Sequence, residues 1–261
     1  MKIAIFQPDA KQATPAQRLQ SLDAVLEEHR HHKTQLLVCP ELFLSGYAEP
    51  NLIRQYACSV DEGIENKTIQ QLSGIASRHG VAIASGYSEN EGGALYNSML
   101  CISASGRLLA NHRKRVLPTP YESDLFNTGQ QMTLFELDNG MRAALLICYE
   151  VEFPEAVRAC ALAGAQLVLV ATALGREWSV VSRQLVPSRA FENGVFLAYA
   201  NYCGSDKMNH YLGDSVIVSP TGEDLGRAGD GVEFISAELD LTGIEQARTR
   251  LPYLRDYPRL V

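Results

Sequence analysis

The sequence predicts an α/β protein whose mixed β-sheets are covered by helices. Apolar runs typical of buried strands alternate with segments of helical spacing, as in the strand–helix units of parallel sheets. In the middle of the chain, three strand-like segments follow one another with only short turns between them, which predicts antiparallel hairpins. Because both kinds of connection are present, we expect mixed rather than purely parallel sheets.

The first part of the chain supplies the first strand–helix units. Residues 3–6 are a predicted buried strand, and residues 14–17, Thr-Pro-Ala-Gln, predict a helix start. In that start the threonine is the N-cap, the proline takes the first helical position and the glutamine closes a capping box. A second strand is predicted at 36–39. A second helix is predicted from about 66 to 78, with Gly80 placed to end it.

The remainder of the chain alternates hairpins and further strand–helix units. Glycines at 92, 93 and 106 lie at the predicted hairpin turns. Two further helices are predicted, at about 154–163 and about 178–192, the second irregular near Pro187. The predicted strands are 81–85, 96–103, 108–111, 143–148, 167–170, 195–200 and 215–219.

Composition and charge exclude several classes of protein. The 261 residues are 46% apolar and 20% charged, without repeats, low-complexity segments or linkers, which favours one globular domain. The net charge of −7 argues against nucleic acid as a partner and against a polybasic membrane anchor. The N-terminal apolar run ends at Phe6, too short for a signal peptide, and the longest uncharged stretch, 159–175, is too short and polar for a membrane span. Six cysteines without CxxC spacing favour a reducing cytoplasm.

Three segments place a reactive polar group directly after an apolar strand, where α/β folds hold their sites. In the first, Glu41 follows the strand at 36–39 and lies between apolar neighbours. A buried carboxylate has a raised pKa unless it is paired, which suits a general base. A helix N-cap or a buried ion pair is an equally good interpretation of this segment alone.

The second segment contains Lys114, followed eight residues later by Glu122. A lysine beside a carboxylate stays charged and can stabilise a developing oxyanion. Alone, the cationic run is better explained as an exposed strand edge, where lysine is common.

The third segment places Cys148 at a strand-to-helix turn. Near a helix N-terminus and a lysine, its thiol is expected to have a lowered pKa. Alone, a buried structural cysteine is the better interpretation, and we assign the other five cysteines to packing. The sequence puts no histidine near Cys148, and spacing alone does not join the three segments into one site.

Residues 29–32, His-Arg-His-His, form a polar cluster at the end of the first predicted helix. His29 and His32 are three residues apart and could share a face, so a metal site is conceivable. A solvated helix end is the favoured interpretation. No dinucleotide, Walker, zinc-protease or calcium-loop signature is present.

In this order, the three segments resemble the motifs of the nitrilase-like carbon–nitrogen hydrolases, and most closely those of bacterial aliphatic or carboxamide amidases. Residues 40–47 resemble the glutamate motif, 112–114 the Tyr-Arg-Lys motif and 148–155 the cysteine motif. The resemblance covers essentially the whole chain, with further agreement at 126–129, 189–193, 200–201 and 213–222.

The resemblance implies a four-layer α–β–β–α sandwich with two mixed sheets, formed by a single domain over 1–261. It implies Cys148 as nucleophile, Glu41 as general base and Lys114 as oxyanion stabiliser, with Glu122 as an accompanying glutamate. It implies neither a cofactor nor a metal. It also implies a homodimer or higher homo-oligomer, with the tail at 251–261 contacting the partner.

The implied reaction converts a small primary amide to carboxylic acid and ammonia through a cysteine thioester. Nitrilase, ω-amidase and N-carbamoyl amide hydrolase activities remain alternatives, as does a catalytically silent binding protein. Tyr149 stands where true nitrilases usually have tryptophan, and Glu152 replaces an arginine that can hold a substrate carboxylate. Arg176 could bind such a carboxylate, although a surface charge is the preferred interpretation. The residues expected to line the acyl pocket are Tyr47, Tyr149, Ala173, Leu174 and Trp178.

Two further departures from the family pattern do not concern the choice of substrate. His112 replaces the tyrosine of the Tyr-Arg-Lys motif and is expected to be a neighbour of the lysine rather than a catalytic group. The C-terminal Asp-Arg-Arg-Pro pattern is replaced from Asp256 onward by Asp-Tyr-Pro, which leaves the dimer contact open.

Overall fold

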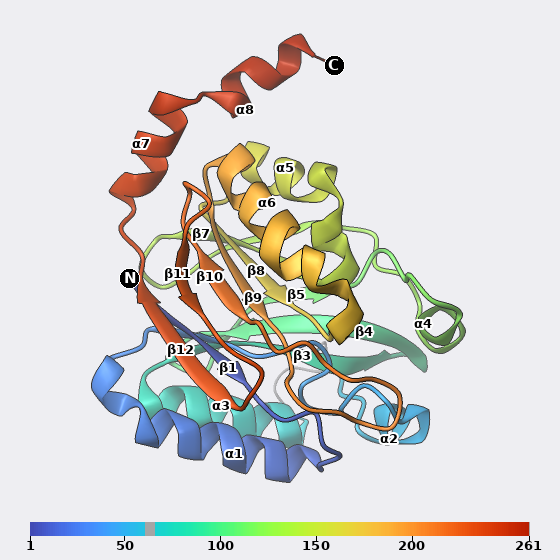
Figure 1. The fold of residues 1–261 in the computed structure, drawn as a ribbon. Coiled ribbons are helices and arrows are strands. Elements are labelled where there is room, and N and C mark those ends of the chain that lie inside the picture. Colours follow the sequence, from blue (N-terminus) through green and yellow to red (C-terminus); the bar gives the residue numbers. More distant parts are fainter. Residues whose placement is uncertain (61–65, 261) are drawn as a thin grey trace.

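Two six-stranded sheets lie face to face in the computed structural model, which describes residues 1–60 and 66–260 (Figure 1). The first sheet has the order β12-β1-β2-β3-β4-β5 and the second the order β11-β10-β9-β8-β7-β6. The first sheet consists of β1 (Lys2–Gln7), β2 (Leu36–Val38), β3 (Ala82–Glu91), β4 (Ala94–Ile102), β5 (Leu108–Arg113) and β12 (Glu233–Glu238). The second consists of β6 (Thr133–Glu136), β7 (Arg142–Ile147), β8 (Leu167–Ala171), β9 (Phe196–Ala200), β10 (Val216–Val218) and β11 (Asp224–Arg227).

Both predicted kinds of connection are present, so the sheets are mixed. Strands β1, β2 and β3 are parallel, as are β7, β8 and β9, whereas β3, β4 and β5 form antiparallel hairpins. Helices α1 (Pro15–Glu28) and α3 (Lys67–His79) cover the outer face of the first sheet, and α5 (Pro154–Leu162) and α6 (Val186–Asn193) cover that of the second (Figure 1). The α–β–β–α sandwich is therefore confirmed.

Apolar residues on both faces of each sheet explain why the strands are continuous apolar runs. In β1, Ile3 and Ile5 pack between the sheets, while Ala4 and Phe6 pack under the helices. Leu145 and Ile147 of β7 enter the same central layer from the second sheet. A strand buried on both faces has no polar side, which is the pattern expected of central strands in layered α/β folds.

The helix ends follow the predicted signals. The side chain of Thr14 caps α1 through a full capping box with Gln17, and Gly80 ends α3 at a φ of 64°. The helix predicted over 178–192 is divided into a 3₁₀ turn (Arg176–Trp178), a π turn (Val181–Leu185) and α6. Pro187 lies in the first turn of α6, where its missing N–H is tolerated, so the irregular backbone precedes it.

Several elements were not predicted, and for β12 the reason is that its partner strand is distant in sequence. Strand β12 pairs antiparallel with β1, in a register that joins Lys2 to Glu238. The C-terminal helices extend beyond α5 and α6 (Figure 1). The other unpredicted elements are α2 (Pro50–Gln55), α4 (Pro120–Leu125), α7 (Thr242–Arg250), α8 (Tyr253–Asp256), β6 and β11. No helix in the described part of the chain has the length and apolar character needed to cross a membrane.

Candidate active site

Three predicted residues lie where strands of both sheets end. Glu41 is in the turn after β2, Lys114 directly follows β5, and Cys148 directly follows β7 at the start of a 3₁₀ turn (Cys148–Glu152). Glu41 and Lys114 are fully buried, and Lys114 Nζ donates to Glu41 Oε1 at 2.8 Å. Both charges act on the Cys148 thiol. The structure therefore joins three segments that spacing alone could not join.

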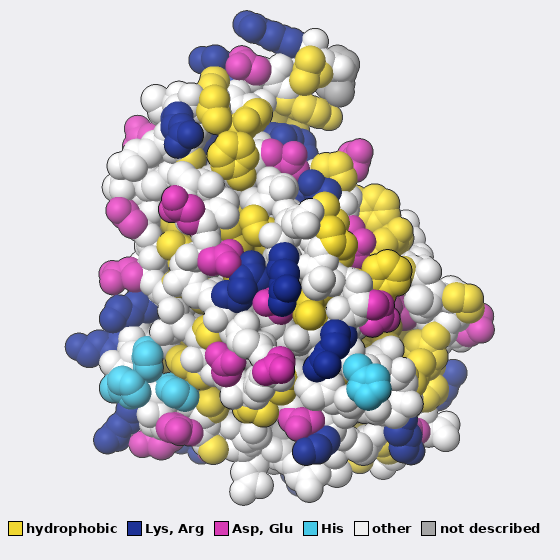
Figure 2. Space-filling model, in the orientation of Figure 1, with side chains coloured by type: hydrophobic (Ala, Val, Ile, Leu, Met, Phe, Trp, Pro, Cys, Tyr) yellow, Lys and Arg dark blue, Asp and Glu magenta, His cyan; other side chains and the backbone are white. Residues whose placement is uncertain are grey.

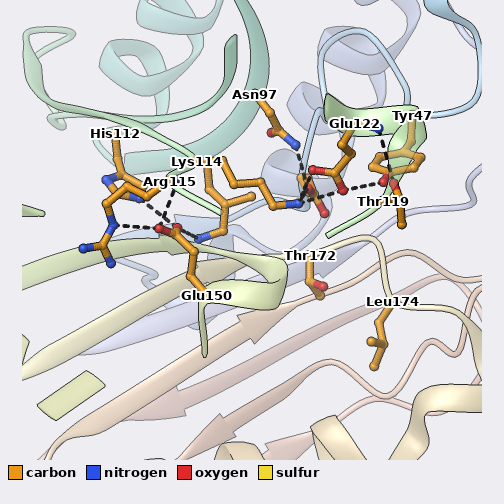
Figure 3. A network of polar contacts seen from close by, with 12 residues as sticks. Tyr47, Asn97, His112, Lys114, Arg115, Thr119, Glu122, Glu150, Thr172 and Leu174 are labelled. Atoms are coloured by element: carbon orange, nitrogen blue, oxygen red, sulfur yellow. Dashed lines mark hydrogen bonds and ion pairs between the residues drawn. The ribbon is translucent and has the colours of Figure 1, made fainter. Parts of the chain in front are cut away.

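Lys114 is held by a second carboxylate. Its Nζ donates to Glu122 Oε1 and Oε2 at 2.9 and 2.7 Å, and the hydroxyl of Tyr47 donates to Glu122 Oε1 at 2.7 Å (Figure 3). Burial opposes the charge on Lys114, but Glu41, Cys148 and Glu122 outweigh it and raise the lysine pKa. Lys114 is therefore a buried ammonium ion fixed between two carboxylates.

Glu41 has one occupied and one unoccupied carboxylate oxygen. Oε1 accepts from Lys114 and, at 2.7 Å, from Asn97 Nδ2, while no group in the described residues hydrogen-bonds to the buried Oε2. Burial raises the pKa of Glu41, and the Lys114 ammonium opposes that rise. A carboxylate of raised pKa with an unused oxygen is suited to accept and return a proton.

Cys148 has a left-handed backbone, with a φ of 49°. Burial, together with the charges of Glu41 and Glu122, raises the pKa of its thiol to about 12, against the opposing effects of Lys114 and a hydrogen bond with Thr172. The expectation of a lowered thiol pKa is therefore wrong, because burial and two carboxylates outweigh one lysine. A thiol of this pKa is protonated at rest, so it needs a base at the moment of attack.

Two glycines allow the Glu41 and Lys114 backbones to lie where they do. A Cβ on Gly86 would lie 2.4 Å from the Leu42 nitrogen and the Pro40 oxygen, so only glycine fits against the turn that carries Glu41. A Cβ on Gly129 would lie 2.1 Å from the Arg113 oxygen, and the Gly129 N–H donates to the Lys114 carbonyl at 2.8 Å.

A third buried carboxylate, Glu150, lies beside the first network (Figure 3). It accepts from Arg115 Nε at 2.8 Å and from the Ile147 N–H at 2.8 Å, and it contacts His112 Nε2 at 2.9 Å. Burial would raise its pKa, but His112, Arg115 and the Ile147 N–H outweigh burial and lower the pKa to about 2. His112 is thus engaged with Glu150, as a neighbour of the lysine segment.

The five residues predicted to line the acyl pocket differ in their contacts and in their exposure to solvent. Tyr47 contacts Glu122 (Figure 3), whereas Leu174 packs with the apolar residues between the second sheet and its helices. Ala173 packs with Tyr202 and Tyr211. The ring of Tyr149 packs edge-on against that of Phe153, with centroids 4.9 Å apart. The side chain of Trp178 is 58% exposed.

Sequence reasoning missed Asn97, Thr172, Glu150 and Gly86. Asn97 lies within β4, and Thr172 directly follows β8. Glu150 offered the one local signal, an acidic residue closely following an apolar strand within the cysteine motif. The contacts of Asn97 and Gly86 with the Glu41 segment span more than 40 positions, which no local pattern encodes.

Comparison with known proteins agrees with this architecture. A model of the carbon–nitrogen hydrolase family matches residues 2–249. A Pseudomonas protegens protein named hydrolase in pqqF 5'region is 37% identical over 98% of this chain and 88% of its own, and an (R)-stereoselective amidase from Pseudomonas sp. is 34% identical over 85% and 79%.

A solved structure leads to the same family. An amidase from Nesterenkonia sp. AN1 superposes with a TM-score of 0.84 at 35% identity, over 98% of this chain and 99% of that one. That amidase is described as a nitrilase-superfamily member, and another of its structures carries acrylamide added to its active-site cysteine. The chain belongs to the carbon–nitrogen hydrolase family, within the nitrilase superfamily, and is an enzyme that cleaves non-peptide C–N bonds.

Proposed function

We propose that this enzyme is an amidase that hydrolyses a small primary amide, aliphatic or carboxamide, to a carboxylic acid and ammonia. The observation that carries the proposal is the convergence of Cys148 with the buried Glu41–Lys114 pair, which is joined at 2.8 Å and whose two charges act on the thiol. These three groups supply a nucleophile, a proton acceptor and a positive charge for the oxyanion.

The first half-reaction forms a thioester. Glu41 takes the thiol proton as Cys148 Sγ attacks the amide carbonyl carbon, and the carbonyl π electrons move onto oxygen. The Lys114 ammonium and the backbone N–H of Tyr149 stabilise this oxyanion. Glu41 then gives its proton to the amide nitrogen, the C–N bond breaks and ammonia leaves.

The second half-reaction regenerates the enzyme. Glu41 takes a proton from a water molecule as the water attacks the thioester carbonyl carbon, and the same cations stabilise the second oxyanion. The C–S bond then breaks, the sulfur recovers the proton from Glu41 and the carboxylic acid leaves. Glu122 keeps Lys114 in place through both steps, with Tyr47 donating to it.

The charges of the site favour a neutral acyl group. Two carboxylates, Glu41 and Glu122, face one ammonium, and half-buried Glu152 also acts electrostatically on Lys114. These carboxylates would repel a carboxylate on the substrate and weaken its binding. This supports simple amides over monoamides of dicarboxylic acids and over carbamoyl amino acids.

We also propose a cytoplasmic homodimer, or a larger homo-oligomer. Phe153 at the start of α5 and Leu162 at its end are 37% and 50% exposed, more than large apolar side chains usually are. Residues 251–260 extend from the same side of the molecule (Figure 1), and the tail at 251–261 is proposed to contact the partner. Light scattering of the full chain and of a chain ending at 250 tests this, since loss of the dimer on truncation is expected.

Ammonia release from a substrate panel tests the activity. The panel contains short aliphatic amides, the matching nitriles, monoamides of dicarboxylic acids and N-carbamoyl amino acids, each with wild type and Cys148→Ala. We expect release from neutral amides, abolished in the variant. Turnover only of nitriles, or only of acidic or carbamoyl substrates, would replace the proposed substrate class. No turnover, together with a Cys148 that resists alkylation, would favour a silent binding protein.

A further inference from the structure

Three histidines gather outside the candidate active site, where α1 ends. His29 is the C-cap of α1, and His31 and His32 lie in the following 3₁₀ turn (Arg30–His32). One ligand nitrogen from each lies within 4.8 Å of the others. The ring centroids are 4.3 to 6.1 Å apart, and the histidine group is visible at the lower left of the surface view (Figure 2). The 3₁₀ turn, with three residues per turn, places His29 and His32 on one side.

Strand β12 contacts two of the three imidazole rings, those of His29 and His32. His32 Nδ1 lies 3.0 Å from Ser236 Oγ, which fixes this ring and leaves Nε2 for a ligand. His29 stacks on Phe234 with ring centroids 4.3 Å apart and planes at 2°. Its buried Nδ1 has no hydrogen-bond partner in the described part of the chain. A buried ring nitrogen without a partner is unfavourable unless a ligand satisfies it.

We propose that His29, His31 and His32 bind a first-row divalent transition-metal ion, with Zn²⁺ as the probe. Imidazole nitrogen is a preferred ligand of such ions, and Zn–N bonds of about 2.0–2.1 Å place tetrahedral ligand nitrogens roughly 3.3 Å apart. The nitrogens must therefore approach by about 1.5 Å at most from 4.8 Å, by side-chain rotation on a surface turn. The fourth position is left to water or an anion.

The bound ion would tie the end of α1 to β12. Because β12 is an edge strand paired with β1, an ion at this place stabilises the folded chain and contributes nothing to the reacting groups. The site is thus expected to act on stability.

Zinc titration in the Cys148→Ala background tests the proposal, since that background removes the active-site thiol as a competing ligand. Isothermal titration calorimetry and thermal unfolding with and without Zn²⁺ are the readouts, and EDTA reverses the shift. We expect one ion per chain, a raised Tm, and more than about tenfold weaker binding in His31→Ala. His210→Ala, another exposed histidine, is the matched control and should bind normally. Equal affinity in both variants, or no saturable binding, would overturn the proposal.

A separate observation concerns Glu150, whose carboxylate joins the two segments that carry the reacting groups. It accepts from the N–H of Ile147, the residue before Cys148. It also holds His112 and Arg115, which flank Lys114 in the chain.

His112 and Arg115 both lie against the Glu150 carboxylate. His112 Nε2 is 2.9 Å from Glu150 Oε2, and His112 Nδ1 is 3.1 Å from Thr133 Oγ1. Arg115 Nε forms an ion pair with Glu150 Oε1 at 2.8 Å. Glu150 therefore connects the turn before Cys148 to residues on both sides of Lys114 in the chain.

Resting on the proposed amidase function, we infer that Glu150 is a positioning residue that fixes Cys148 relative to Lys114. The left-handed backbone of Cys148 is unfavourable for an L-residue by about 1–2 kcal/mol, so surrounding contacts must maintain it. The hydrogen bond from Ile147 to Glu150 is such a contact, immediately next to the nucleophile.

Glu150→Gln is compared with Glu89→Gln to test this inference. Glu89 is equally buried and is bonded to Arg113, Asn111 and Ser98, but it has no contact with the Cys148 turn in the described structure. Both variants lose a buried ion-paired carboxylate beside the Lys114 segment and should be destabilised. Only Glu150→Gln should lower kcat, by more than about tenfold with KM nearly unchanged.

The rate of Cys148 alkylation by iodoacetamide supplies a readout that does not depend on amidase turnover. It should change in Glu150→Gln and not in Glu89→Gln, with folding checked by circular dichroism. Glu150→Asp, which keeps the charge, should recover part of kcat. Equal losses of kcat in Glu89→Gln and Glu150→Gln, or an unchanged alkylation rate, would contradict the positioning role. If the wild type hydrolyses none of the amides but Glu150→Gln still changes the alkylation rate of Cys148, the proposed substrate class is refuted and the positioning role is kept.

Discussion

Glu41 and Glu150 are both almost fully buried, yet their environments shift their pKa values in opposite directions. Four side-chain and backbone groups lie within hydrogen-bond distance of the two oxygens of Glu150, and its pKa is lowered to about 2. Glu41 accepts from two groups on one oxygen and leaves the other unused, and its pKa is raised. The comparison teaches that the number of donors, more than burial, separates a carboxylate that anchors structure from one that moves protons.

Glu41→Gln should give the largest effect. The amide keeps the shape but cannot take the thiol proton, so we expect kcat/KM to fall roughly 10²–10⁴-fold. Because Glu122 still pairs with Lys114, the variant should remain folded and gain stability at neutral pH from the loss of a charge whose pKa burial raises. Steady-state ammonia release and thermal unfolding measure both effects. A variant with near-normal kcat/KM would end the proton-carrier assignment.

Gly86→Ala should come next. Its Cβ would lie 2.4 Å from the backbone of the Glu41 turn, which must then shift. A displacement of about 1 Å at a reacting group can reduce the rate on the order of 10²-fold. Activity normalised to the folded fraction is the measurement. Gly74→Ala, in the interior of α3 with nothing within 4 Å of the added carbon, is the control and should gain up to about 1 kcal/mol.

The acid stability of the enzyme should depend on Glu150. A carboxylate with a folded pKa of about 2 and an unfolded value of about 4.3 stabilises the fold above the unfolded value by about 3 kcal/mol. That contribution is lost as pH falls from about 4 toward 2. Denaturant unfolding of wild type across this window should show the decline, and Glu150→Gln should show a flatter profile from a lower starting stability. Parallel profiles would contradict the anchoring role.

Tyr47→Phe should have the smallest effect. Burial, together with the charges of Glu41 and Glu122, raises the Tyr47 pKa, so its hydroxyl stays protonated and donates to Glu122. Loss of one such hydrogen bond costs about 0.5–1.5 kcal/mol, which lowers kcat by roughly tenfold or less. Initial rates on the best amide of the panel test this. A loss as large as that of Glu41→Gln would mean that Tyr47 acts on the substrate itself.

The sequence predicted what local patterns determine. The capping box at Thr14, the end of α3 at Gly80 and the doubly buried strands all followed from adjacent residues. Strand β12 was missed because its partner β1 lies at the other end of the chain, and no neighbouring residue signals that pairing.

The candidate site shows the same division. Glu41, Lys114 and Cys148 were each identified from the strand that precedes them, and the family resemblance placed them together. The thiol pKa was predicted in the wrong direction, since it depends on burial and on Glu122, which become neighbours only in the folded chain. Asn97 went unnoticed for the same reason, since it lies 56 positions from Glu41 in the sequence.

The reacting groups come from opposite sides of the central apolar layer. Glu41 and Lys114 follow strands of the first sheet, whereas Cys148 follows a strand of the second. The rate of turnover therefore depends on how closely the two sheets pack against each other. A denaturant that weakens the packing between the two sheets should therefore abolish turnover, and refolded enzyme should regain activity only when both sheets pack together again.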